Sequence, residues 1–220
     1  MKSTINIILT GATGMVGEGV LQTALQHPAI GTVLVITRRP SGLQHPKLKE
    51  VIHQDFGNLQ AIEASLTGYD ACLFCLGTTS VGKSQEDYFK TTYTLTMHVA
   101  ETLSRLNTDM TFCYISGAGT DSKESSRLHW ARVKGKTEND LQQLPFKAVY
   151  NFRPGFIRPM KGQRNILPVY KYIGWIFPIG RALSPGGFCK VEELGRAMIH
   201  AAQKGYPKHI LEGKDIIQSS

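Results

Sequence analysis

Short apolar runs rich in β-branched residues alternate along the chain with longer segments of helical period. Nearly continuous apolar runs are typical of strands that a parallel sheet buries on both faces. Apolar residues that recur every three to four positions are typical of amphipathic helices. The pattern predicts strands at residues 5–10, 32–37, 71–76, 110–115 and 146–152, a weaker run at 51–52, and helices at 16–27, 59–66, 86–106 and 129–143.

The regular alternation of strands and helices also predicts the overall architecture. Strand–helix–strand units of this spacing form right-handed crossovers and build an open parallel sheet. No internal repeat and no linker rich in proline, glycine and serine divides the sequence. We therefore expect residues 1–220 to form a single α/β domain with a doubly wound parallel sheet.

Composition and charge narrow the class of partner. The 220 residues are 41% hydrophobic and 19% charged, as in an ordinary globular domain. The net charge of +8 comes from scattered basic residues, which suit a polyanionic small molecule as readily as nucleic acid. Because the sequence has no basic tail and no nucleic-acid-binding motif, we expect a small-molecule partner and no nucleic acid.

The sequence also bears on cellular location and metal binding. No apolar stretch approaches the ~18 residues of a membrane span, and the apolar run at residues 5–9 is too short for a signal peptide. We therefore expect a cytoplasmic protein with no transmembrane segment. Cys72 and Cys75 form a CxxC, but their odd spacing in an expected strand sends them to opposite faces of the sheet. We expect small core residues there and no metal site.

A glycine-rich loop, Thr10-Gly11-Ala12-Thr13-Gly14-Met15-Val16-Gly17, joins the first expected strand to the first expected helix. Glycines at this spacing allow a tight turn, a close approach of the backbone to a pyrophosphate and close packing of the helix on the sheet. The helix N-terminus offers N–H groups to the phosphates. The loop predicts a dinucleotide-binding site. The alternative interpretation is a purely structural glycine turn that binds no ligand. The expected cofactor-binding residues are Gly11, Thr13, Gly14, Met15, Val16 and Gly17.

Two arginines follow the second expected strand. In an NAD site an acidic residue in this region holds the ribose 2′-hydroxyl, whereas this chain has Arg38 and Arg39 there. A guanidinium pairs bidentately with a phosphate and stacks on an adenine ring. The pair predicts NADP(H) as the cofactor in preference to NAD(H). A solvated arginine pair at a strand end is the alternative.

Together with later segments, this loop resembles that of the short-chain dehydrogenases/reductases of the extended or atypical type, which have the pattern TGxxGxxG and include NAD-dependent epimerases and dehydratases. The resemblance is good over residues 5–158 and loose beyond, although residues 191–197 are similar to a late helix of the family. It implies a Rossmann-like fold. By position it also implies cofactor contacts for Asp55, Phe56, Cys75, Leu76, Gly77, Pro154, Gly155 and Phe156, and catalytic and cofactor-binding roles for Ser116 and Lys134.

The chain departs from the family at the catalytic tyrosine. The family pattern is Tyr-x-x-x-Lys, but Trp130 stands four residues before Lys134. In the family the lysine lowers the pKa of the phenol, and an indole N–H cannot exchange its proton in that way. Tyr93 and His129 are alternative proton donors, although core or surface placement explains both equally well. In another alternative no protein acid is needed, because a quinone or flavin takes its proton from solvent.

An aromatic segment broken by prolines, residues 165–188, lies in the region that covers the substrate in the family. It is interpreted as a lid over the nicotinamide, as a dimer or membrane-surface patch, or as plain core. We expect a short C-terminal substrate-covering segment at about residues 159–190, and a homodimer is one interpretation of its apolar surface.

Three functions compete. The first is an NADPH-dependent reductase of a planar apolar acceptor (a quinone, flavin or carbonyl) that works without a tyrosine acid. The second is a non-catalytic NADP(H)-binding protein with a regulatory or scaffold role. The third, nucleotide-sugar epimerisation, is disfavoured by Trp130 and by a C-terminal portion too short for a nucleotide-sugar pocket.

Overall fold

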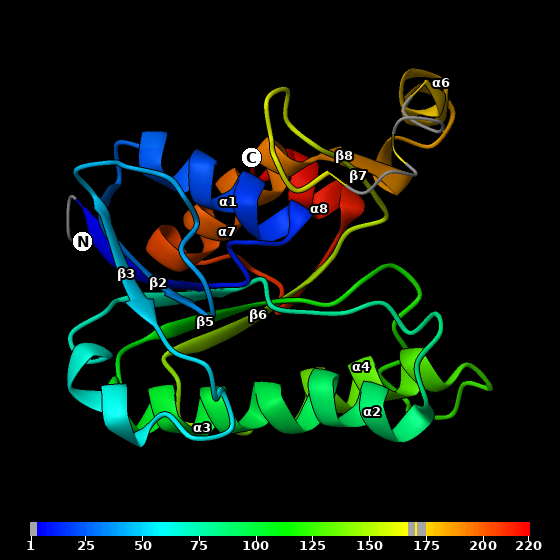
Figure 1. Cartoon of the computed structure of the whole chain (residues 1–220). Coiled ribbons are helices and arrows are strands. Elements are labelled where there is room, and N and C mark those ends of the chain that lie inside the picture. Colours follow the sequence, from blue (N-terminus) through cyan, green and yellow to red (C-terminus); the bar gives the residue numbers. More distant parts are fainter. Residues whose placement is uncertain (1–3, 167–169, 171–174) are drawn as a thin grey trace.

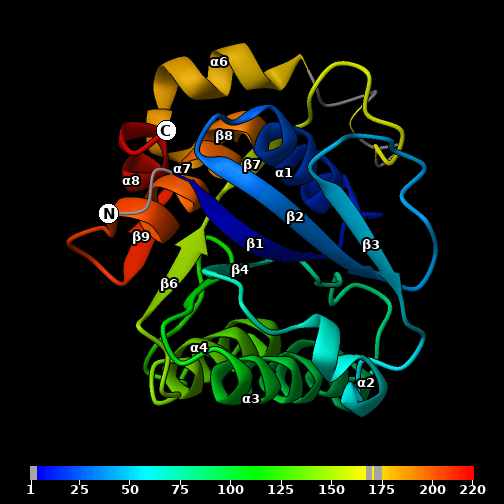
Figure 2. The same cartoon turned by 90° about the vertical axis from the view of Figure 1, so that its left-hand side faces the viewer.

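A computed structural model describes residues 4–166, 170 and 175–220 of the chain. Within these residues the main sheet has seven strands, all parallel, in the order β3-β2-β1-β4-β5-β6-β9 (Figure 2). The strand order reverses between β1 and β4, which is the topological switch point where ligands bind in doubly wound sheets. The expected Rossmann-like α/β fold is confirmed. The strands are β1 (Ile5–Thr10), β2 (Ile30–Thr37), β3 (Leu48–Ile52), β4 (Ala71–Phe74), β5 (Thr111–Ile115), β6 (Ala148–Arg153) and β9 (Ile210–Glu212).

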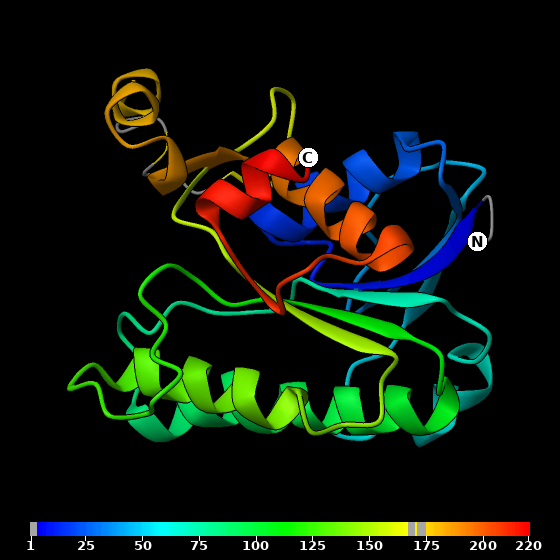
Figure 3. The ribbon, with the colours of Figure 1, turned by 180° about the vertical axis from the view of Figure 1, so that it is seen from behind.

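Helices cover both faces of this sheet, as Figures 1 and 3 show. One face carries α1 (Met15–Gln26), α7 (Val191–Lys204) and α8 (Gly213–Gln218). The other carries α2 (Gln85–Phe89), α3 (Leu95–Leu106) and α4 (His129–Leu141). No helix among the described residues combines the length and the apolar character needed to cross a bilayer.

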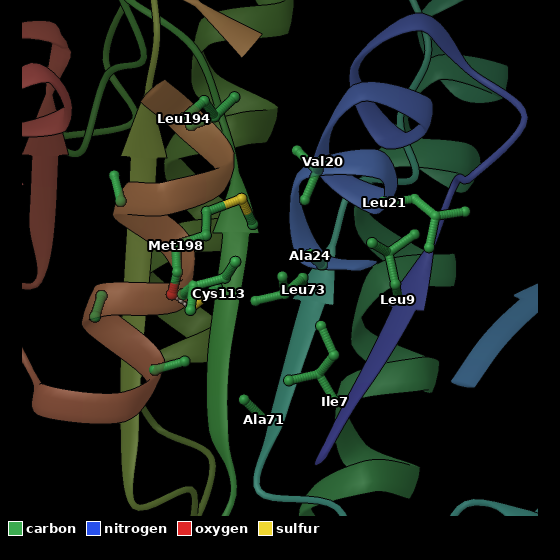
Figure 4. Close-up of a cluster of buried hydrophobic side chains, with 14 of the residues drawn as sticks. Ile7, Leu9, Val20, Leu21, Ala24, Ala71, Leu73, Cys113, Leu194 and Met198 are labelled. Atoms are coloured by element: carbon green, nitrogen blue, oxygen red, sulfur yellow. Dashed lines mark hydrogen bonds between the residues drawn. The ribbon is translucent and has the colours of Figure 1, made fainter. Parts of the chain in front are cut away.

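Alternate side chains of each strand enter two separate cores. Ile7 and Leu9 of β1 are fully buried on the side of α1 and α7, while Ile8 between them is buried on the side of α3. Figure 4 shows the first core, where the β1 side chains meet those of the two helices. Burial of an aliphatic side chain contributes about 1.5–3 kcal/mol, which explains why the apolar runs predicted the strands so well. Cys72 and Cys75 lie toward opposite cores, as their spacing predicts.

Two expected helices differ in detail. The long helix at 86–106 contains one π-helical turn, η2 (Lys90–Thr94), between α2 and α3. A π turn inserts an extra residue, and such turns are frequent at functional sites. The expected helix at 59–66 is a 3₁₀-helix, η1 (Gln60–Ser65), which is typical of short helical segments.

Several C-terminal elements were not expected from the sequence, and the strands among them, at three residues each, are too short to show a two-residue alternation. They are β9 and α8, the parallel pair β7 (Phe156–Arg158) and β8 (Phe188–Lys190), α6 (Ile176–Leu183) and the short 3₁₀-helix η3 (Pro185–Gly187). In Figure 1, α6 with β7 and β8 lies at the end of the molecule away from the N-terminus. Residues 167–169 and 171–174 of the expected lid lie outside the described residues.

Candidate cofactor-binding site

The turn between β1 and α1 requires glycine at two positions. Gly11 has φ +76°, and a Cβ there would lie 2.5 Å from the carbonyl oxygen of Cys75 in the neighbouring strand end. A Cβ on Gly17 would lie 2.1 Å from the carbonyl oxygen of Gly11. Helix α1 therefore lies directly against the turn, with no space for any side chain between them.

Gly14 differs from these two glycines because it is exposed and its surroundings are open. Its N–H donates to the Gly11 carbonyl at 2.9 Å, and the nearest atom to an added Cβ is 3.4 Å away. Gly14 is also the N-cap of α1. The following N–H groups, those of Met15, Val16 and Gly17, belong to the first helical turn and have no intrahelical acceptor. Such a helix end is suited to binding an anion.

A cleft of about 440 Å³ opens beside this loop. The cleft brings together eight of the expected cofactor-binding residues. They belong to the glycine loop, to the arginine pair after β2 and to the segment after β4. The other lining residues, which the sequence did not predict, come from the β4–α2 loop, from η2 and from the start of α3. The lining residues are Gly11, Thr13, Gly14, Arg38, Arg39, Cys75, Leu76, Gly77, Thr78, Lys83, Thr91 and Leu95.

Hydrogen bonds fix the backbone of Arg38 and Arg39, whereas their guanidinium groups extend into solvent. The amide of Gln54 donates to the Arg38 carbonyl at 2.6 Å, and the Thr37 hydroxyl donates to the Arg39 carbonyl at 2.7 Å. Both arginine side chains are exposed, and neither guanidinium pairs with another described residue. Since no carboxylate is among the described residues that line the cleft, its charge is positive.

Asp55 and Phe56 lie apart from this cleft. The Asp55 carboxylate accepts a 2.8 Å hydrogen bond from the Gly57 N–H and lines a separate hollow with His53 and Asn58. Phe56 is buried in the core beneath β1 and β2. The cofactor contacts that the family resemblance implies for these two residues remain predictions.

The loop after β5 holds Ser116 in an internal hydrogen-bond chain. Its Oγ lies 2.7 Å from the hydroxyl of Thr120, which donates to the Gly117 carbonyl at 2.8 Å. Because the Thr120 proton is used in this way, the Ser116 hydroxyl is the donor to Thr120. Ser116 is 8% exposed, and its hydroxyl is hydrogen-bonded within the protein.

Lys134 of α4 lies beneath the same loop. Its ammonium donates to the carbonyl oxygens of Ser116 at 2.9 Å and Ile115 at 3.4 Å, and it lies 5.4 Å from the centre of the Tyr114 ring. Burial lowers the pKa of Lys134 to about 8, while the Glu138 carboxylate one helical turn further on acts in the opposite direction. A ligand at this position must therefore compete with two backbone carbonyls for the ammonium.

Trp130 packs on the turn that follows Ser116. The far edge of its indole ring is 3.3 Å from the position of a Cβ on Gly119, whose φ is +86°. Trp130 and Lys134 are four residues apart on α4 and therefore lie on the same face of the helix. An apolar ring thus covers the turn beside Lys134.

Tyr93 and His129, the alternative proton donors, are both bonded to neighbouring helices. The Tyr93 hydroxyl donates to Asp140 of α4 at 2.6 Å, and this hydrogen bond to a carboxylate, with burial, raises its pKa. His129 Nε2 lies 3.1 Å from the carbonyl of Gln85, so this nitrogen carries the proton. These contacts favour structural roles for both residues.

A buried ion pair ties α4 to the ends of β6 and β9. Arg153 binds the Glu138 carboxylate through Nε, at 2.9 Å, and through a terminal nitrogen. Its other terminal nitrogen contacts Glu212 of β9 at 3.3 Å. Arg153 also lines a cavity of about 670 Å³ with Ala118, Lys208 and Lys214. Seven of the twelve residues that line this cavity are charged or polar.

The segment after β6 makes structural contacts. The Pro154 carbonyl accepts a 2.9 Å hydrogen bond from the Ala118 N–H, and a Cβ on Gly155 would lie 2.3 Å from the Gly187 carbonyl oxygen. Phe156 packs against the rings of Phe177 and Phe188. None of these residues lines the cleft beside the glycine loop, so their expected cofactor contacts stay predictions.

The fold and the glycine loop at the switch point define a dinucleotide-binding protein of the Rossmann class. Residues 7–129, more than half of the chain, match the model of the NAD dependent epimerase/dehydratase family. The chain therefore belongs to that family, and the resemblance found in the sequence is confirmed.

Two solved structures illustrate the similarity of fold. The Bordetella bronchiseptica enzyme WbmF, in complex with NAD⁺ and UDP, is 17% identical with a TM-score of 0.66, and the match covers 98% of this chain and 76% of that one. Helicobacter pylori ADP-L-glycero-D-manno-heptose-6-epimerase has the same identity and TM-score, with 98% and 81% covered.

Curated relatives match over nearly the whole chain. Protein fmp52, mitochondrial, of Emericella nidulans is 27% identical over 97% of both chains. The protein of the same name from Aspergillus fumigatus is 28% identical over 96% of this chain and 92% of the relative. The expectation of a cytoplasmic protein is wrong by this comparison, since these relatives are named as mitochondrial proteins.

Proposed function

We propose that this chain binds NADP(H) and reduces a planar apolar acceptor, a quinone, flavin or carbonyl, without a tyrosine acid. One observation carries the proposal: the cleft beside the glycine loop is lined by Arg38, Arg39 and Lys83 and by no carboxylate among the described residues. A site selective for NAD(H) needs an acid for the ribose hydroxyl, which would repel a 2′-phosphate.

The glycine loop fits a dinucleotide on its own geometry. The open surroundings of Gly14 leave the first turn of α1 accessible, so the N–H groups of Met15 and Val16 would hold the pyrophosphate. Arg38 and Arg39 would hold the 2′-phosphate, because their guanidiniums are free and exposed. The Leu76–Gly77 backbone, where the Leu76 N–H donates to the Thr10 hydroxyl at 3.3 Å, would pass beside the ribose.

NADPH, when bound, would supply a hydride to the acceptor. Lys134 would orient the nicotinamide ribose from below the loop after β5, and Ser116 would orient an oxygen of the acceptor. Trp130 contributes an apolar surface over this loop, which suits a planar ring. A quinone or flavin takes its proton from solvent, so the absence of a phenol at position 130 is compatible with its reduction.

A second candidate is a non-catalytic NADP(H)-binding protein. It is favoured by the internal hydrogen bonds of the two expected catalytic side chains: Lys134 donates to backbone carbonyls, and Ser116 donates to Thr120. A nucleotide-sugar epimerase remains disfavoured by Trp130.

The cofactor assignment is tested with the double variant Arg38→Asp/Arg39→Ala. We expect its affinity for NADPH to fall about a hundredfold, because two charge-assisted hydrogen bonds are lost, and its affinity for NADH to change less than about threefold. Isothermal calorimetry measures both. Arg127→Asp is the control, since this exposed arginine does not line the cleft. Equal losses for the two cofactors would refute the 2′-phosphate assignment.

Turnover separates the two candidates. Oxidation of NADPH is followed by its loss of absorbance, with a soluble quinone, a flavin or an aldehyde as the acceptor. We expect hydride transfer to the quinone or the flavin. Tight NADPH binding with no oxidation by any of the three acceptors would instead establish the binding protein.

A further inference from the structure

The loop between β4 and α2, residues 75–84, carries a cation that the family resemblance did not point to. Lys83 lines the cleft together with Arg38, Arg39 and the glycine loop. Its side chain is exposed and pairs with no other described residue. Its charge is therefore available to a ligand in the cleft.

The topology places this lysine on the opposite side of the glycine loop from the two arginines. The glycine loop follows β1, which lies between β2 and β4 in the sheet (Figure 2). Arg38 and Arg39 follow β2, whereas Lys83 belongs to the connection that follows β4. An anion in front of the glycine loop would thus have cations on both of its sides.

The residue after Lys83 is fixed by a helix cap, whereas the glycines before it have open surroundings. Ser84, the N-cap of α2, accepts from the Asp87 N–H at 3.0 Å, and its hydroxyl donates to the Asp87 carboxylate at 2.7 Å. That acid is thereby engaged by the cap. A Cβ on Gly77 or Gly82 would meet no heavy atom within 4 Å, so the loop has free space beside it.

Resting on the proposed function, we propose that Lys83 binds a phosphate group of the dinucleotide from the β4 side of the cleft. The cofactor is then held between a pair of guanidiniums and an ammonium that come from strands on either side of β1. The phosphate is either the 2′-phosphate or the pyrophosphate, both of which offer the oxygen acceptors that an ammonium binds.

The test compares Lys83→Ala with Lys83→Arg and with Lys123→Ala, an exposed loop lysine that does not line the cleft. We expect Lys83→Ala to weaken NADPH by roughly tenfold, the effect of one charge-assisted hydrogen bond. Lys83→Arg keeps the charge and is expected to bind within about threefold of the unmodified chain. Lys123→Ala is expected to bind like the unmodified chain. Calorimetry measures affinity, and circular dichroism checks the fold.

Two further ligands identify the phosphate. If Lys83 binds the 2′-phosphate, Lys83→Ala weakens NADPH and adenosine 2′,5′-bisphosphate but leaves NADH unchanged. If it binds the pyrophosphate, NADPH and NADH weaken alike. Either pattern supports the proposal.

The proposal would be overturned if Lys83→Ala bound NADPH as tightly as Lys123→Ala does. If Arg38→Asp/Arg39→Ala nevertheless lost NADPH binding, the proposed function would stand without this inference. If the unmodified chain binds no dinucleotide, the proposed function and this inference fail together.

Discussion

Two regions at the carboxyl edge of the sheet are built in opposite ways. In the cofactor region, made of the glycine loop, Arg38, Arg39 and Lys83, the backbone is tightly packed while the charged side chains are free. In the β5–α4 region, made of Ser116, Thr120, Trp130 and Lys134, the side chains are bonded or packed within the protein. The first region is ready for an anionic ligand, whereas the second must rearrange its hydrogen bonds to engage one.

This difference separates binding from chemistry. A protein can retain a cofactor through the cofactor region alone, because phosphate recognition requires fixed N–H groups and cations. Reduction of a carbonyl further requires a proton donor in place. In the β5–α4 region the residue four positions before Lys134 is Trp130, whose indole N–H is not an acid of that kind. The comparison therefore favours acceptors that need no protein acid.

The largest effect is expected from breaking the ion pair beneath the β5–α4 region. Glu138→Ala leaves the buried guanidinium of Arg153 without its main partner, and we expect the free energy of unfolding to fall by about 3–5 kcal/mol. Urea denaturation measures it. The control is Glu63→Ala, which breaks an exposed pair with Arg105 and is expected to cost less than about 1 kcal/mol. Equal costs for the two variants would show that the pair does not hold this region.

A smaller effect on stability is expected from adding a methyl group to the glycine turn of the cofactor region. Gly17→Ala forces a Cβ against the Gly11 carbonyl and is expected to reduce stability by about 1–3 kcal/mol. Gly14→Ala meets no such contact, so we expect a thermal midpoint near that of the unmodified chain but weaker NADPH binding. Thermal denaturation and calorimetry measure the two effects. Unchanged NADPH binding by Gly14→Ala would argue against a phosphate at this turn.

The smallest effect concerns position 130. Trp130→Tyr places a phenol four residues before Lys134, and we expect NADPH-dependent aldehyde reduction to rise by about tenfold. The gain stays below the roughly hundredfold or more of a fully positioned acid because the Lys134 ammonium is engaged by two carbonyls. Trp130→Phe controls for the change of ring size. An equal gain in both variants would show that space, and not a proton, limits the reaction.

The sequence predicted best what depends on local rules. The glycine loop and the apolar strands follow from backbone geometry and burial, and the structure has them where they were expected. Arg38 and Arg39 were found because a strand end fixes their place relative to the loop. Lys83 was missed because it reaches the cleft only through the path of the β4–α2 loop, which no spacing rule gives.

Residues assigned by family position fared less evenly. Cys75, Leu76 and Gly77 line the cleft, since they directly follow the strand beside β1. Asp55 and Phe56 do not line the cleft. In the turn after β3 the phenylalanine is buried, and the Asp55 carboxylate accepts a hydrogen bond from the Gly57 N–H. Tyr93 was a candidate only by its place along a helix, and its hydrogen bond to Asp140 could not be foreseen from sequence.

The most direct measurement is a calorimetric titration of the unmodified chain with NADPH and with NADH under the same salt and pH. We expect NADPH to bind at least about tenfold more tightly, because its additional phosphate meets cations that no carboxylate of the described cleft lining neutralises. Tighter binding of NADH, or equal affinity for the two, would contradict this expectation.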